Sequence, residues 1–170
     1  MLQPRQCGAC TLCCTVIAVE ELGKAQGVDC QHSIPGKGCA IHRSPLRPRA
    51  CGRFECQWLI QRQMPDSFRP DLTGVVLTAI DSPPRLLAVC DEADALAWRR
   101  EPIYSFLKRQ TRSQLIAPIT VLARSGPRLW LLTATTDLDL GEVSADSVLQ
   151  VVTADDGTVT VSVQPPAPPP

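Results

Sequence analysis

Residues 7–14 read CGACTLCC, which places four cysteines within eight positions. Four more cysteines follow before position 57, and a ninth stands apart at Cys90. The Cys-x2-Cys spacing occurs twice in succession, and this spacing lets one chain reversal direct two thiolates at one metal ion. The segment therefore predicts a site for zinc or an iron–sulfur cluster, whose candidate ligands are Cys7, Cys10, Cys13, Cys14, Cys30, Cys39, Cys51 and Cys56.

The cellular compartment bears on whether these cysteines bind metal or form disulfides. The N-terminal residues lack the apolar core of a secretory signal, and no stretch approaches the ~18 apolar residues of a membrane span. We therefore expect a cytoplasmic protein without a membrane partner, and a reducing cytosol favours metal ligation over disulfides. The 17 basic and 17 acidic residues cancel, so the charge balance predicts no nucleic-acid partner.

The adjacent cysteines Cys13 and Cys14 leave two arrangements open. Either both bind one metal, which is geometrically awkward, or each faces a different site; we expect them to act jointly with the distant cysteines. His32 and His42 follow cysteines closely enough to reach a metal, but eight thiols suffice without them. Cys90 falls in a predicted strand, where we expect a small buried side chain with no function.

Basic residues recur in the cysteine-rich segment. They could neutralise a negatively charged thiolate site or donate hydrogen bonds to its sulfurs, or they could be ordinary solvated side chains. Both interpretations stay open for Lys37, Arg43, Arg47, Arg49 and Arg53.

The character of the sequence changes after the cysteines. Two prolines interrupt 64–71, and from position 72 β-branched runs alternate with turn-forming residues. We expect strand pairs at 72–80 with 85–92, at 117–124 with 128–135, and at 147–154 with 158–164, around a Ser-Gly-Pro turn and an Asp-Asp-Gly turn. The stretch 91–114 is helix-like, and it places Ile103, Phe106 and Leu107 on one face.

These patterns predict an α+β protein in three parts. Residues 1–63 form a small irregular cysteine-rich metal-binding module, 64–164 an α+β strand-rich region with one main helix, and 165–170 a disordered Pro-rich tail. A structural metal site contributes about 10–16 kcal/mol to the folding of a small segment. Without metal, we expect the module to be disordered.

The quoted motifs resemble a known family. "CGACTLCC", "GCAIH" and "RPRACGRFECQWL" are similar to the YkgJ-type cysteine-cluster proteins, the bacterial CxxCxxCC family of zinc- or iron-chelating proteins, to which flagellin lysine N-methylase is related. The resemblance covers about the first third of the chain and implies that all eight clustered cysteines are ligands. Arg47-Pro48 matches the family's Arg-Pro step, whereas "HRSPLRP" resembles a short local insertion that weakens His42 as a ligand.

Three functions compete on the sequence. The first is a cluster that moves electrons or supports a redox or methyl-transfer enzyme, because eight thiols exceed what one tetrahedral ion uses. The second is a zinc-stabilised module that meets a protein partner and has no catalytic activity of its own. Thiol–disulfide exchange ranks last, since no thioredoxin-like pattern surrounds the cysteines. No catalytic or cofactor-binding residue is assigned beyond the metal ligands, because nucleotide, phosphate and hydrolase motifs are missing from the sequence.

Overall fold

A five-stranded sheet forms the centre of the computed structural model, which describes residues 5–112, 119–154 and 159–165. Its strand order is β3-β4-β5-β6-β7, with every neighbouring pair antiparallel except the parallel β4–β5 pair. The strands are β3 (Val75–Asp81), β4 (Pro84–Cys90), β5 (Thr120–Ser125), β6 (Arg128–Leu132) and β7 (Asp137–Glu142). The expected pairs β3–β4 and β5–β6 are confirmed, as is the α+β class.

Two features of this region differ from the sequence prediction. Strand β7 was not expected, because its sequence DLDLGE is rich in aspartate and glycine, which strands disfavour. The main helix α5 begins at Ile103 and extends to Arg112, and two short 3-10 turns, η3 (Glu92–Asp94) and η4 (Ala97–Arg99), precede it. Pro102 lacks an amide hydrogen and restricts the residue before it, which explains why the helix starts only after Pro102.

One face of the sheet is covered by α5 and η4. Trp98 and Leu107 are fully buried there, and the ring of Trp98 lies 5.7 Å from that of Trp130 on β6. Ile103 and Leu107 are buried and Phe106 packs at the margin, as the helical spacing predicted. This face holds the largest apolar cluster of the described chain.

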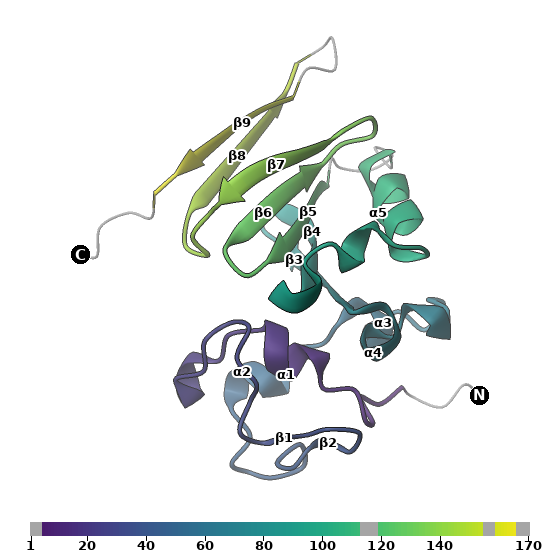
Figure 1. Cartoon of the computed structure of the whole chain (residues 1–170), viewed down its shortest axis with the longest axis vertical. Helices are drawn as coiled ribbons and strands as arrows, with labels where there is room; N and C mark the ends of the chain where they lie inside the picture. Colours follow the sequence, from purple (N-terminus) through teal and green to yellow (C-terminus); the bar gives the residue numbers. More distant parts are fainter. Residues whose placement is uncertain (1–4, 113–118, 155–158, 166–170) are drawn as a thin grey trace.

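The opposite face is covered by two separate elements (Figure 1). The antiparallel ribbon of β8 (Val148–Thr153) and β9 (Val159–Gln164), the third expected strand pair, packs through Leu149 near Leu122 and Leu131. Val16 of the N-terminal helix α1 (Leu12–Val16) packs against Val76 and Val89. The cysteine-rich segment is therefore anchored directly on the sheet.

The cysteine-rich segment contains short elements only. Within residues 5–63, the buried hydrophobic side chains are Val16, Val19 and Trp58. Its elements, with the two that link it to the sheet, are α1, η1 (Glu20–Leu22), β1 (Ser33–Ile34), β2 (Gly38–Cys39), α2 (Arg49–Arg53), α3 (Gln57–Ile60), η2 (Asp66–Phe68) and α4 (Pro70–Thr73).

Some expectations fall outside the described residues. The Asp-Asp-Gly turn at 155–157 does, and so does the Pro-rich tail except Pro165. Among the described residues, no helix combines the length and the apolar character that crossing a bilayer requires.

Candidate metal centre

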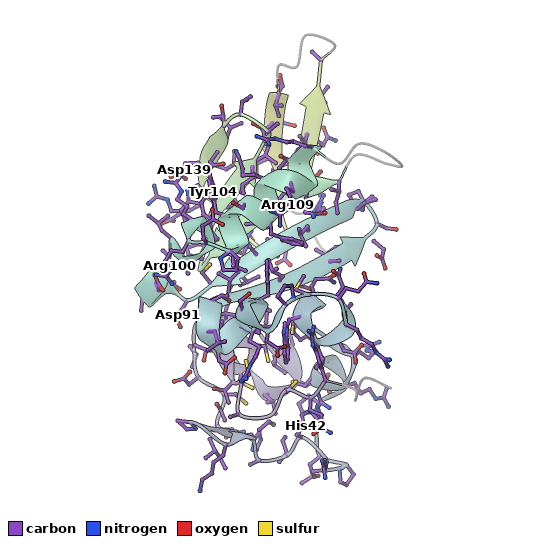
Figure 2. All side chains as sticks on the ribbon, turned by 90° about the vertical axis from the view of Figure 1, so that its right-hand side faces the viewer. His42, Asp91, Arg100, Tyr104, Arg109 and Asp139 are labelled. Carbon is purple, nitrogen blue, oxygen red and sulfur yellow. The ribbon has the colours of Figure 1, made fainter. Side chains whose placement is uncertain are left out.

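All eight clustered cysteines line one cavity of about 870 Å³ in the N-terminal segment. Each is a free thiol and partly buried. Figure 2 shows the sulfur atoms gathered among the elements of this segment, with His42 on the side away from the sheet. Residues up to 49 positions apart in the sequence, from Cys7 to Cys56, thus share one space.

The first four cysteines are placed by a turn followed by a helix. The Cys10 amide donates to the Cys7 carbonyl at 3.0 Å, which closes a turn over the first Cys-x2-Cys unit. The Cys14 amide then donates to Thr11 at 2.8 Å, and α1 carries both Cys13 and Cys14. Packing of Val16 against the sheet orients this helix, so the sheet positions two of the candidate ligands.

Cys30 and Cys39 are brought to α1 by backbone contacts. The Cys30 amide donates to the Cys14 carbonyl at 3.0 Å, and Cys39 pairs with Ser33 in the β1–β2 hairpin. The hairpin rests on the first cysteine loop so closely that a β-carbon at Gly38 would overlap the carbonyl oxygen of Gly8. Gly38 also has a φ of +98°, a conformation that favours glycine.

Cys51 and Cys56 are placed by the short helices α2 and α3. The Glu21 carboxylate accepts from the amides of Arg49 at 2.9 Å and Ala50 at 2.8 Å, so it caps α2 from a distant turn. These two bonds lower the pKa of Glu21. The Cys56 carbonyl accepts from the amide of Leu59 in α3, and its side chain packs at the margin of the main core.

Lys24 is a buried cation beside the thiols that sequence analysis missed. Its ammonium donates to the carbonyls of Ile17 at 2.6 Å, Thr15 at 3.0 Å and Ala25 at 3.1 Å, which uses all three of its hydrogens. Burial lowers the pKa of Lys24, and the nearby thiolates of Cys30 and Cys14 oppose this effect. The position of Lys24 between Cys14 and Cys30 in the sequence could have indicated that it lies near the thiols. The turn that directs its side chain into the protein has no recognisable sequence motif.

Other cations surround the cavity more openly. Arg5, Lys37, Arg43 and Arg47 line it against a single lining carboxylate, Glu55. Of the basic residues considered from the sequence, Lys37, Arg43 and Arg47 thus lie at the site. Arg49 and Arg53 are not among the lining residues of the described cavity.

Arg47 also has a structural role. Its guanidinium donates to the Cys51 carbonyl at 2.6 Å and to the His42 carbonyl at 3.4 Å, and so ties together two segments of the cavity wall.

The thiols do not ionise equally. A hydrogen bond from the Cys13 thiol, helped by the charges of Lys24 and Arg47, lowers the pKa of Cys14 to about 7. The same hydrogen bond and burial raise the pKa of Cys13. Burial is the largest cause that raises the pKa of Cys7 and Cys56. The thiolate is the form of cysteine that binds metals, and the lowered pKa of Cys14 favours this form.

The cysteines share a cavity without sharing a coordination sphere. Within residues 5–112, 119–154 and 159–165, no three His, Cys, Asp or Glu side chains are arranged to hold a metal ion. The donor set nevertheless suits soft or borderline metals, since it consists of thiols ringed by cations. His32 and His42 also line the cavity, and burial lowers the pKa of His42.

Cys90 is separate from the cavity. It lies in β4 with 1% of its surface exposed, packed in the main core, as expected. Burial raises its pKa to about 12, so it behaves as a small apolar residue.

No protein-family model, curated protein or solved structure matches this chain.

Proposed function

We propose that this chain is a cytoplasmic metal-binding protein of the YkgJ type, which binds zinc or an iron–sulfur cluster through Cys7, Cys10, Cys13, Cys14, Cys30, Cys39, Cys51 and Cys56. The observation that carries the proposal is that these eight free thiols, and not Cys90, line one cavity. Chance placement of thiols would not select the eight and leave the ninth in an apolar core.

The charge around the cavity supports a negatively charged occupant. Four thiolates on a divalent ion, or on a cubane cluster, leave a net charge of about −2. Lys37, Arg43 and Arg47 line the cavity together with one carboxylate, Glu55, and Arg5 lines it as well, although its guanidinium is paired with Asp66. Buried Lys24 adds a further cation beside Cys14 and Cys30. Cations at this position also stabilise thiolates over thiols, which favours metal binding at neutral pH.

The weak apolar core of the segment supports a structural contribution from the metal. Three buried hydrophobic residues in positions 5–63 cannot stabilise a segment of this length. Metal binding contributes about 10–16 kcal/mol in comparable small domains, where binding and folding are coupled.

The role that we favour is redox or electron transfer, or support of a partner enzyme. Eight thiols exceed the requirement of one structural zinc ion, and the apolar side chains Ile17 and Trp58 in the cavity wall would limit solvent access to a cluster. The chain's own part in such a role is to hold the sulfurs, supply compensating charge and keep water out.

A zinc-stabilised interaction module is the second candidate. The observation that favours it is the outer face of the β8–β9 ribbon, where Val148 and Val152 are 48% and 63% exposed. Under this second proposal, the metal stabilises the N-terminal segment, the β8–β9 ribbon binds a protein partner, and the protein has no redox activity.

Anaerobic purification followed by elemental analysis and absorption spectroscopy tests the proposal. An iron–sulfur protein should be brown, with iron and acid-labile sulfide in equal amounts. Colourless protein with stoichiometric zinc would favour the interaction module. Protein that carries neither metal and binds none after anaerobic reconstitution would overturn the metal-binding proposal as a whole. The control variant Cys90→Ala, which keeps the core position apolar, should match the wild type in metal content.

A further inference from the structure

Charge is unevenly distributed between the cysteine-rich segment and the rest of the chain. Residues 30–54 contain five basic residues and no aspartate or glutamate, whereas the rest of the chain holds 12 of the 17 basic residues and all 17 acidic ones. We propose that the surface formed by this stretch docks an acidic protein partner beside the metal cavity. The inference rests on the proposed function, because it names the class of partner that would reach the bound metal. The docking surface consists of Lys37, Arg43, Leu46, Arg47, Arg49 and Arg53.

Hydrogen bonds hold the loop that precedes α2 against this helix. The Arg47 amide donates to the Ser44 carbonyl at 3.1 Å, which closes a turn in the loop. The Arg47 guanidinium donates to the Cys51 carbonyl at 2.6 Å and so joins the loop to α2. Arg49 and Arg53 are four positions apart in α2, so they lie on the same side of the helix. The loop and the helix thus place these basic residues in one small region.

The basic side chains of the docking surface are available to a partner. Four of the five are exposed, and Arg47 is partly buried. None of the five forms an ion pair with a carboxylate in the described parts of the chain. Glu21 lies beside α2, but its carboxylate accepts from backbone amides there. Arg100 and Arg128, which are exposed on the sheet region, differ in that each pairs with an aspartate.

The bound metal does not account for all of this positive charge. A four-thiolate site brings a net charge of about −2. Lys37, Arg43 and Arg47 line the cavity, where they can offset that charge. Arg49 and Arg53 are not among the lining residues of the described cavity and are exposed. Their charges therefore remain for a partner that approaches from solvent.

An exposed leucine favours a protein partner over a nucleic acid. Leu46 is 79% exposed, the largest fraction among the large hydrophobic side chains of the described chain, and basic residues flank it in the sequence. Protein interfaces combine an apolar centre with a charged rim that steers association. Single-stranded nucleic acids instead bind to aromatic side chains, and residues 30–53 contain no phenylalanine, tyrosine or tryptophan. Helix α2 has only five residues, too few for a recognition helix in a DNA groove.

Fluorescence anisotropy with a defined acidic probe tests the docking surface. The probe is a labelled peptide of glutamates around two central leucines. The full-length protein is loaded with cobalt(II), whose thiolate absorption reports that the metal site is intact. We expect the peptide to bind, and its affinity to fall as the salt concentration rises, because the charges are exposed. A peptide with serines in place of the two leucines should bind more weakly.

Variants outside the cavity lining identify the residues that bind the peptide. Arg49→Gln/Arg53→Gln should weaken peptide binding about tenfold and leave the cobalt absorption unchanged. Leu46→Ser should weaken it about fivefold, because an apolar contact is lost. Arg109→Gln/Arg112→Gln is the matched control: it removes the same charge from exposed positions of α5 and should bind like the wild type.

The outcomes separate the docking surface from the proposed function. A wild type that binds the peptide no better than Arg49→Gln/Arg53→Gln, or an equal loss in the α5 control, would overturn the docking surface and leave metal binding intact. An oligo(dT) of 20 nucleotides that binds the same residues more tightly than the peptide would also overturn it, in favour of a nucleic-acid partner. A wild type that acquires no cobalt absorption would overturn the proposed function, whatever the peptide does.

Discussion

The sheet region and the cysteine-rich segment are stabilised in different ways. The sheet buries its apolar residues on both faces, with Trp98, Leu107 and Val121 almost completely covered. The segment at 5–63 buries three hydrophobic side chains and instead gathers eight thiols around a cavity. The sheet can therefore fold by burying apolar surface, whereas under the proposed function the segment gains the missing free energy from a bound metal. The comparison teaches that one chain can combine a region with a large apolar core and a segment with little apolar core of its own.

Metal removal should have the largest effect and should affect one region only. After treatment with chelator and reductant, we expect amides of residues 7–56 to exchange rapidly while those of β3 to β6 stay protected. The physical reason is the loss of about 10–16 kcal/mol of metal binding from a segment with little apolar core. Hydrogen exchange with mass spectrometry makes the measurement, and equal protection of both regions before and after treatment would contradict it.

Trp98→Ala should damage the sheet region. Removing a fully buried tryptophan costs about 3–5 kcal/mol, because it deletes apolar contacts and leaves a cavity. The urea midpoint of the metal-loaded protein should fall accordingly. Leu72→Ala, at a side chain that is 66% exposed, is the control and should change the free energy of unfolding by less than about 0.5 kcal/mol.

Gly38→Ala should separate the hairpin from the first cysteine loop. The backbone strain costs about 1–3 kcal/mol, and the overlap with the Gly8 carbonyl adds to it. Cobalt affinity should fall because Cys39 is displaced. Gly52→Ala is a matched control, since Gly52 lies in α2 with open space around its α-carbon; an equal loss of affinity there would show that the hairpin contact is unimportant.

Lys24→Met should destabilise the thiolates of the cysteine-rich segment. The change removes a buried cation and leaves the carbonyls of Thr15, Ile17 and Ala25 without their donor, at a cost of about 1–3 kcal/mol. The pKa of Cys14 should rise because a nearby positive charge is lost. Cobalt affinity at pH 7 measures the effect, because the lost charge stabilises the bound thiolates, and Lys37→Met, which removes an exposed lining cation, should weaken binding less.

Glu21→Gln should have the smallest effect, confined to the capping of α2. The pKa of Glu21 is lowered in the folded protein. Its stabilising contribution is therefore present above the unfolded pKa of about 4.3, and it is lost as the pH falls through the lower folded value. The difference in urea midpoint between variant and wild type should be largest near pH 7 and shrink on acidification; a constant difference would rule out the charged cap.

Strand pairing in the C-terminal region could be predicted because it depends on local patterns. Runs of valine and leucine around tight turns indicated three hairpins, and the spacing of Ile103, Phe106 and Leu107 indicated the buried face of α5. Strand β7 was not found in this way, because the aspartates and glycine of DLDLGE are disfavoured in strands, and its pairing is decided by β6. The start of α5 at Ile103 was not predicted, because the expected helical stretch began at position 91. The restriction that Pro102 places on the residue before it accounts for the later start.

The cysteine spacing determined, by itself, which eight residues are candidate ligands and that Cys90 is not one of them, because Cys-x2-Cys geometry is local. The tertiary structure decided what spacing cannot. It determined that α1 packs on the sheet through Val16 and that Gly38 fits against Gly8. It also determined that the side chain of Lys24 is buried beside the thiols and that the carboxylate of Glu21 caps α2. These contacts join residues that are distant in sequence, and no local pattern records a contact whose two partners are chosen by the whole fold.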